Sequence, residues 1–371
     1  MTKKTLILFL SICVFVFCLW SLQTPPKSQN KSTETAINAT STGQTIIQKT
    51  IATTTENNKK VVTEPKPVIS QKPKASIPVV TEQKITEPTP NFELINTFAR
   101  QATVNILCIV KNNNLSPISG TGIIINSDGL ILTNAHIAQY FLLRDLYQKD
   151  FIDCVIRTGS PAYPKYHAEL VYISPTWVEN NKTEIKLENP QGTGEKDYAF
   201  LRITDVIDGS SLPNFSYIPV SIREKIDINE PVVLVSYPAG FLGGLSIIQN
   251  LYITSAITNI QNIFTFGENT VDVIAVGGTV VSQKGASGGA VVDKNSSLIG
   301  IISTSSNGNT TSNRELNAIT LAYINRNLQS EIGLTLPEFL SQDLASFAKT
   351  FQETTAVNLT KILTDEIIKN Q

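Results

Sequence analysis

A series of short apolar segments separated by turn signals is the feature that most restricts the fold of this chain. Twelve such segments lie between residues 91 and 335, six before residue 210 and six after it. In chain order they are ATVNILCIV, GTGIIIN, GLILTNAH, FIDCVIRTG, KYHAELVYI, DYAFLRI, EPVVLVSYP, LYITSAITNI, TVDVIAVGGTVV, GGAVVDK, SLIGIISTS and AITLAYI. Short strands at such spacing predict an all-β domain. The even division fits two six-stranded barrels, at about 91–210 and 211–335.

One serine lies among small residues in QKGASGGAVV, residues 283–292. Glycine costs stability inside regular structure, so this cluster indicates a sharp turn or a close backbone approach. The stretch also fits the Gly-x-Ser-x-Gly pattern of a nucleophile elbow. In that arrangement the histidine follows the serine, whereas both histidines of this chain, His136 and His167, precede Ser287. The order of the residues excludes the elbow.

A serine hydroxyl becomes a useful nucleophile when a histidine held by a carboxylate takes its proton. An aspartate before the histidine would have to be Asp128, which lies in a predicted turn only eight residues before His136. The remaining possibility is a set of three catalytic residues in the chain order histidine, aspartate, serine. Asp197, at the start of a predicted strand, is the candidate aspartate. We interpret His167 as a structural strand residue.

His136 itself lies at the exit of a predicted β-hairpin, GTGIIINSDGLILTNAH, residues 120–136. TNAH at 133–136, KDYAFL at 196–201 and GASGG at 285–289 resemble the three signature blocks of trypsin-like serine peptidases. The first and last blocks look most like the bacterial HtrA type. The resemblance covers about residues 100–330 and implies a chymotrypsin-like pair of Greek-key β-barrels that hydrolyses peptide bonds.

The resemblance also implies a role for each site residue. His136 would be the general base, Asp197 its orienting carboxylate and Ser287 the nucleophile. The backbone N–H groups of Gly285 and Ser287 would form the oxyanion hole. Substrate-binding positions would be Val281, Lys284, Ser303, Thr304 and Ser305.

Two departures from the family limit these expectations. Ala286 stands where trypsin has the aspartate that pairs with a newly cut N-terminus, so activation by that route is not expected. HtrA-type peptidases usually carry a PDZ domain after the barrels, and 36 residues follow residue 335.

Residues 278–284 contain no acid, and Val281 stands where trypsin has an aspartate. Small or aliphatic side chains are therefore expected before the scissile bond.

The charge and the metal-ligating residue types restrict the partners. The net charge is −1 and the pI about 6.2, which gives no sign of a nucleic-acid partner. The sequence has two histidines and no Cys-x-x-Cys pair or phosphate loop. We therefore expect protein or peptide substrates, with no cofactor and no metal.

The N-terminal segment is predicted to anchor the chain in the cell membrane as a single-pass protein. Residues 5–22 are eighteen uncharged residues, long enough to cross a bilayer core of about 30 Å. Lys3 and Lys4 place residues 1–4 in the cytoplasm and the catalytic domain outside. A cleaved signal peptide is the alternative, but small residues at a cleavage site fit poorly here. Residues 23–90, rich in Thr, Lys, Pro and Ser, predict a disordered linker.

Three further segments are predicted to be insertions or additions to the barrels. Residues 138–150 look helical, and residues 175–196 form a polar loop anchored by Trp177 that leads to Asp197. By resemblance this loop borders the substrate subsites, although an insertion without function explains it equally well. Residues 336–371 form a helical segment. Its apolar stripe comprises Phe339, Leu340, Leu344, Phe347, Ala348 and Phe351, and would pack on the barrel or on another subunit of a homo-oligomer.

Cys108 and Cys154 are the cysteines outside the predicted membrane segment. The resemblance places them in the first and fourth strands of one barrel, which lie side by side. We therefore predict a disulfide between them, since disulfides persist in an extracytoplasmic compartment. Two buried free thiols are the alternative.

Two other functions stay open at the level of the sequence. A peptidase-like protein that has lost activity could serve as a binding or scaffolding module. The same three residues could also hydrolyse esters.

Overall fold

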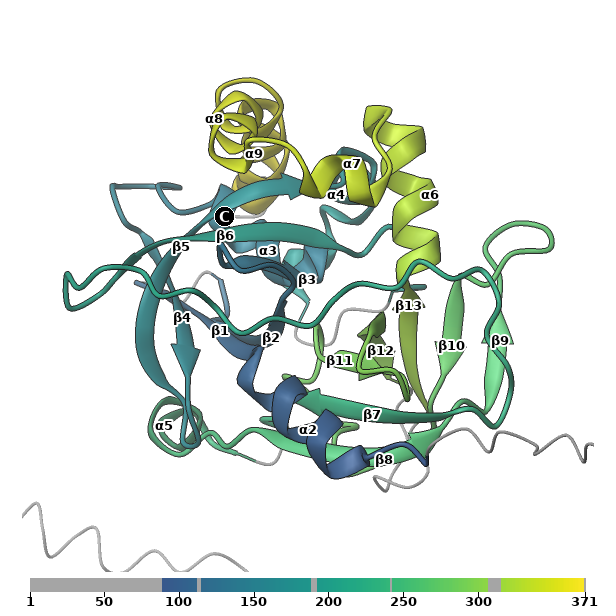
Figure 1. Ribbon diagram of the computed structural model, residues 1–371. Coiled ribbons are helices and arrows are strands. Elements are labelled where there is room, and N and C mark those ends of the chain that lie inside the picture. Colours follow the sequence, from purple (N-terminus) through teal and green to yellow (C-terminus); the bar gives the residue numbers. More distant parts are fainter. Residues whose placement is uncertain (1–88, 112–114, 188–191, 241, 306–314, 370–371) are drawn as a thin grey trace, which may run out of the picture. The chain divides into compact units, whose positions relative to one another are not determined.

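The computed structural model describes residues 89–111, 115–187, 192–240, 242–305 and 315–369, and two antiparallel sheets follow each other along this part of the chain (Figure 1). The first half contains α2 (Phe92–Gln101), β1 (Thr103–Val110), β2 (Ile118–Ile124), β3 (Leu130–Thr133), α3 (Ala135–Leu142), β4 (Ile152–Thr158), β5 (Tyr163–Ile173), α4 (Pro175–Asn181), the 3-10 turn η1 (Glu184–Lys186) and β6 (Ala199–Val206). The second half contains β7 (Pro231–Ser236), α5 (Gly244–Gln249), β8 (Thr254–Asn259), β9 (Asn262–Phe264), β10 (Val273–Ala275), β11 (Ala290–Val292), β12 (Leu298–Ser305) and β13 (Leu316–Thr320). Four helices follow, α6 (Leu321–Ile332), α7 (Leu336–Leu340), α8 (Leu344–Glu353) and α9 (Thr355–Ile368).

The first sheet is a closed barrel with the strand order β1-β2-β3-β6-β5-β4. This confirms the six-stranded barrel that the sequence predicts for this half. Its strands carry fully buried side chains on both faces, among them Ile106, Ile123, Ile131 and Phe200. Each such side chain contributes about 1.5–3 kcal/mol when it is removed from water. The barrel is therefore a rigid support for the residues at its strand ends.

The second sheet differs from the prediction of six strands closed into a barrel. It has seven strands in the order β8-β7-β11-β12-β13-β10-β9. The additional strand arises because the predicted strand at 251–260 and the residues after it turn a corner. Ile260 donates its N–H to Glu230 O beside β7, and Gln261 donates its N–H to Ala275 O at the end of β10. One continuous segment thereby supplies both edge strands of the sheet.

One helix replaces predicted strand residues, and another precedes the first strand. The predicted strand 318–324 ends at Thr320, whose hydroxyl accepts the N–H of Tyr323 and so caps the start of α6. At the other end of the domain, α2 precedes β1, and Asn91 caps it by accepting the N–H of Leu94. Side-chain caps of this kind satisfy backbone donors that a helix start leaves unpaired.

Helix α8 packs along β5 of the first barrel with α9 against it, whereas α6 packs on β12 and β13 (Figure 1). Phe339 is fully buried, with its ring centroid 4.7 Å from that of Phe200. Phe351 contacts Tyr172 at a centroid distance of 5.5 Å. The apolar stripe thus packs on the barrel of its own chain, which was one of the two predicted partners. A homo-oligomer through these helices stays a prediction.

The predicted segments 1–4 and 5–22 lie outside the described residues, as does nearly all of the predicted linker 23–90. Among the residues that the structure describes, no helix is both long enough and apolar enough to span a membrane.

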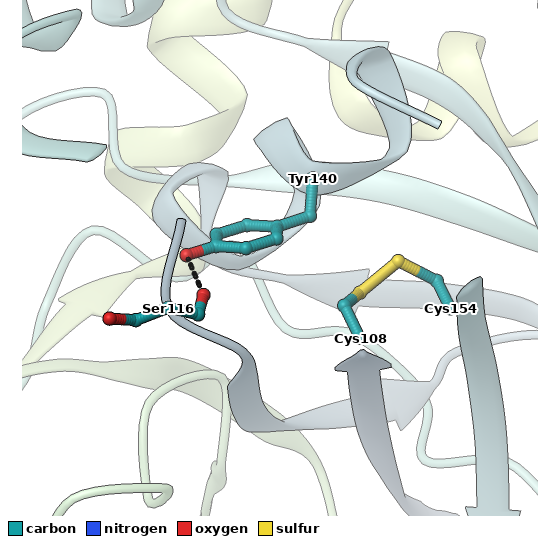
Figure 2. The surroundings of a disulfide bond; sticks show 4 residues. All are labelled: Cys108, Ser116, Tyr140 and Cys154. Carbon is teal, nitrogen blue, oxygen red and sulfur yellow. Dashed lines mark hydrogen bonds between the residues drawn. A yellow bond between two sulfur atoms is a disulfide. The ribbon is translucent and has the colours of Figure 1, made fainter. Parts of the chain in front are cut away.

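A disulfide joins Cys108 on β1 to Cys154 on β4 (Figure 2). The two residues are direct partners in the register of these strands, with their Cα atoms 4.0 Å apart. Next to the disulfide, Tyr140 donates its hydroxyl to Ser116 O at 2.9 Å. Burial raises the pKa of Tyr140 to about 12, so this hydroxyl keeps its proton at physiological pH. The disulfide therefore ties β1 to β4, and the hydrogen bond ties α3 to the segment before β2.

Removing the disulfide should lower the free energy of unfolding. The bond closes a chain separation of 46 residues, and on the chain-entropy model such a loop stabilises the folded state by about 4 kcal/mol. A Cys108→Ala/Cys154→Ala double variant should lose stability of this order in urea titrations at equilibrium. As a control, oxidised wild-type protein that is unfolded without reductant should take up no thiol-alkylating reagent at either cysteine. Labelling of both cysteines in that sample would contradict the bond.

Candidate active site

Strand register brings His136 and Asp197 together. β3 and β6 are antiparallel neighbours, and Thr133 at the end of β3 lies opposite Ala199 at the start of β6. His136 follows this pair by three residues on one chain segment, and Asp197 precedes it by two residues on the other. His136 is not at the strand exit as predicted, but in the first turn of α3.

Two hydrogen bonds connect these residues directly. The His136 ring nitrogen Nδ1 lies 2.8 Å from Asp197 Oδ2, and the His136 backbone N–H donates to Asp197 Oδ1 at 3.0 Å. An ionised carboxylate only accepts hydrogen bonds, so Nδ1 carries the proton and Nε2 keeps a lone pair. The imidazole is therefore held in the tautomer and orientation that a general base requires.

The carboxylate of Asp197 is buried, and its side chain is 6% exposed. A buried charge is costly unless hydrogen bonds compensate it. Ser303 on β12 supplies a third bond, donating its hydroxyl to Asp197 Oδ2 at 2.8 Å. Asn134 donates its side-chain amide to the carbonyl of Asp197 at 2.8 Å. Groups from both sheets therefore fix the position of this carboxylate.

Ser287 lies on the segment between β10 and β11, in residues 283–289, which we call the serine turn. The side of the turn that faces the first barrel is held by β2, because Thr121 donates its backbone N–H to Ser287 O at 2.8 Å. Gly288 donates its N–H to Ile302 O on β12 at 2.8 Å. Ser287 is half-buried at this junction of the two sheets.

Thr121 also connects the serine turn to the strand that leads to His136. Its carbonyl accepts the hydroxyl of Thr133 at 2.7 Å, three residues before the histidine. The packing is tight, since a Cβ atom at Gly288 would lie 1.9 Å from Thr121 O. The structure thus places His136 and Asp197 in direct contact, and Thr121 connects Ser287 to the strand that leads to His136.

The N–H groups of residues 285–289 fall into two sets. Ala286, Gly288 and Gly289 donate theirs to Gln283 O, Ile302 O and Ala286 O. In the part of the chain that the structure describes, no backbone carbonyl accepts from Gly285 or Ser287. These two N–H groups remain for a ligand oxygen, as an oxyanion hole requires.

The predicted substrate-binding positions have different environments. Val281 is fully buried in the apolar cluster of the second sheet, whereas Lys284 is exposed. Ser303 contacts Asp197, a role that the sequence did not indicate. Thr304 and Ser305 end β12, where they pair with Asn317 and Leu316 of β13. The described residues contain no group of His, Cys, Asp and Glu side chains that could hold a metal ion.

His167 lies apart from this site on the barrel strand β5. Its Nδ1 atom is 2.6 Å from Asp205 Oδ1, and both side chains are about half exposed. The hydrogen bond from His167 lowers the pKa of Asp205. This exposed pair agrees with the interpretation of His167 as a strand residue.

Sequence reasoning missed Thr121, which carries more contacts to the serine turn than any predicted residue. The available signal was the sequence GTG at 120–122, in which a polar residue flanked by glycines interrupts an apolar strand. A Cβ atom at Gly120 or Gly122 would lie 2.7 or 2.5 Å from an isoleucine side chain. The two glycines are therefore required by the packing around the strand, whereas the threonine serves to bind the serine turn.

A closed barrel followed by a second antiparallel sheet, with a histidine and an aspartate on the first and a serine turn on the second, defines the chymotrypsin-like class of fold. Residues 120–301 match the family described as the trypsin-like peptidase domain. The chain therefore carries a trypsin-like peptidase domain. No curated protein matches the sequence at a significant level.

Two solved structures are similar to the chain. One is the serine endoprotease from Yersinia pestis, with 21% identity over 67% of this chain and 68% of that chain, at a TM-score of 0.40. The other is the active form of the Rv3671c protease from M. tuberculosis, with 17% identity over 72% of this chain and 96% of that chain, also at a TM-score of 0.40.

Substituting Gly288 should test the tight contact between the serine turn and β2. Gly288→Ala places a Cβ atom against Thr121 O at a φ of +81°. Strain at positive φ and overpacking each cost about 1–2 kcal/mol, so a loss of about 3 kcal/mol is expected. Gly209→Ala is the matched control, because Gly209 has a φ of +78° and nothing within 4 Å of the added atom. Equal losses for the two variants in urea titrations would contradict the contact.

Proposed function

We propose that this protein is a serine endopeptidase that cleaves peptide bonds through an acyl-enzyme on Ser287. The observation that carries the proposal is the double hydrogen bond of Asp197 to His136, together with a serine turn in which the N–H groups of Gly285 and Ser287 have no backbone acceptor among the described residues. The trypsin-like peptidase domain at residues 120–301 supports it.

The proposed chemistry assigns one step to each of these groups. His136 Nε2 takes the proton of the Ser287 hydroxyl as the oxygen attacks the carbonyl carbon of the substrate. Negative charge develops on the carbonyl oxygen, which the N–H groups of Gly285 and Ser287 stabilise. His136 then gives the proton to the leaving amine, and the peptide bond breaks. Water repeats the sequence on the ester, releasing the acid and restoring the Ser287 hydroxyl.

Asp197 serves this cycle without taking up the proton itself. Its contact with Nδ1 favours the imidazolium that forms when Nε2 is protonated, and it keeps the ring from rotating. The bonds from Ser303 and from the His136 backbone hold the carboxylate in place during this change.

Labelling with a fluorophosphonate probe tests the proposal. Wild-type protein should react at Ser287, and Ser287→Ala or His136→Ala should abolish both labelling and peptide hydrolysis. Asp197→Asn should lower kcat by about 10⁴-fold, because an amide favours the wrong tautomer of His136.

The exposed pair provides matched controls for this experiment. His167→Ala and Asp205→Asn remove a histidine and an aspartate in similar contact, and both should leave labelling intact. A folded wild-type protein that takes up no probe would favour an inactive peptide-binding module. Labelling with hydrolysis of esters alone would favour the esterase.

We propose small or aliphatic side chains on the residue before the scissile bond. The support is the absence of an acid in residues 278–284 and the buried, apolar Val281 among them. A peptide library should show this preference in the rates of cleavage. A clear preference for Arg or Lys would refute it, and a preference for acidic residues would point to the exposed Lys284.

We propose that the peptidase domain is held at the outer face of a cell membrane by residues 5–22, on the strength of their sequence. Alkaline extraction of membranes, which releases proteins that do not span the bilayer, tests this anchor. Release of the full-length chain would refute it.

A further inference from the structure

Every carbonyl group along the centre of the serine turn is fixed by a hydrogen bond. The carbonyl of Lys284 accepts from Ala239 N at 2.6 Å, and that of Ala286 accepts from Gly289 N at 2.8 Å. The remaining two, Gly285 O and Ser287 O, accept from the side chain and the backbone of Thr121, each at 2.8 Å. Four successive peptide groups are thereby held in defined orientations.

These orientations determine where the two unpaired N–H groups point. In a trans peptide the C=O and N–H bonds point in opposite directions. The Gly285 N–H therefore points away from Ala239, because the carbonyl of its own peptide group points toward that residue. The Ser287 N–H points away from Gly289 for the same reason. A rotation of either peptide plane would remove a donor from the proposed oxyanion hole.

Glycine leaves this turn with little resistance to such rotation. Gly285 has a φ of +89° and Gly288 a φ of +81°, conformations that glycine adopts at low cost. Glycine also adopts negative φ easily, so the residues themselves do not hold the planes in place. The bond from Gly289 N to Ala286 O supplies one restraint within the turn, and the remaining restraint has to come from outside it.

Thr121 supplies that restraint at two places. Its hydroxyl donates to Gly285 O and accepts the backbone N–H of Tyr237 at 3.0 Å. Tyr237 begins the segment whose Ala239 holds the carbonyl of Lys284. One hydroxyl therefore fixes the central peptide group of the turn and also the segment that fixes the peptide group before it.

The Tyr237 end of this arrangement is firmly attached to the first barrel. Its hydroxyl donates to Gly159 O at 2.8 Å, and burial raises its pKa to about 12, so the donor keeps its proton. Leu251, farther along the same connection, accepts the N–H of Ala162 at 2.7 Å. Thr121 is itself fully buried on β2. Both supports of the turn are thus attached to the first barrel.

We propose that Thr121 is a positioning residue that acts through the serine turn and holds the N–H groups of Gly285 and Ser287 in the orientation that binds an oxyanion. This role rests on the proposed function of the site. Thr121 lies in the first barrel, and the donors that it orients lie in the turn that leads into the second sheet. It therefore couples the geometry of the serine turn to the packing of the barrel against the second sheet.

Thr121→Val keeps the shape of the side chain and removes its hydroxyl. With the turn loosened, the oxyanion donors should lose their alignment, and kcat should fall by about 10- to 100-fold with KM little changed. Thr121→Ser retains the hydroxyl and should restore kcat to near the wild-type value. A residue that only stabilised the fold would not separate kcat from KM in this way.

Thr320→Val is a matched control. The hydroxyl of Thr320 is equally buried, and it also donates to one backbone carbonyl, Val271 O, and accepts one backbone N–H, that of Tyr323. It makes no hydrogen bond to the serine turn in the described structure. Thr320→Val should therefore lose comparable stability and keep kcat.

Hydrogen exchange provides a measurement that does not depend on activity. In Thr121→Val the amides of residues 283–289 should exchange faster than in wild-type protein, and in Thr320→Val they should not. Unchanged exchange, or a wild-type kcat in folded Thr121→Val, would overturn the role of Thr121 while the proposed function stands. Faster exchange in a protein whose wild type hydrolyses no peptide would overturn the proposed function and support the restraint of the turn by Thr121.

Discussion

The contact between Thr121 and the serine turn joins the two sheets, and the geometry of the candidate site depends on it. The register of strands β3 and β6 brings His136 and Asp197 together within the first barrel. The serine cannot reach them in the same way, because its position is set by the pairing of β11 with β7 and β12. The backbone hydrogen bond from Thr121 N to Ser287 O fixes the position of the serine relative to the first barrel.

A second set of contacts supports the aspartate from the side of the C-terminal helices. The N–H of Lys196 donates to the hydroxyl of Tyr323 at 3.0 Å, and Tyr198 donates its hydroxyl to Asn327 at 2.7 Å. Tyr323 and Asn327 lie on α6. The residues on both sides of Asp197 are therefore held by the helix that follows the second sheet. The carboxylate itself is compensated by His136 and Ser303, which are far from it in the chain.

The sequence predicted the features that depend on local patterns. Alternating apolar residues and turn signals located strands in both sheets, and the order of His136, Asp197 and Ser287 indicated one class of site. The pattern could not show that residues 254–264 turn a corner, because Ile260 and Gln261 are distinguished only by their partners across the sheet. For the same reason it gave Ser303 a substrate-binding role: a serine in an apolar strand carries no sign that a carboxylate lies opposite. Thr121 was missed because its partners are carbonyl groups, which every residue has.

The exposed pair of His167 and Asp205 has a consequence for how sites of this kind are recognised in structures of unknown function. Its Nδ1 to carboxylate distance, 2.6 Å, is shorter than the 2.8 Å of His136 and Asp197. A geometric template that ranked histidine–aspartate pairs by separation would place the surface pair first. What distinguishes the other pair is its surroundings: a buried carboxylate that accepts from a backbone N–H and a serine hydroxyl in addition to the imidazole. A template that scored the number of donors converging on the carboxylate would rank the two pairs in the opposite order.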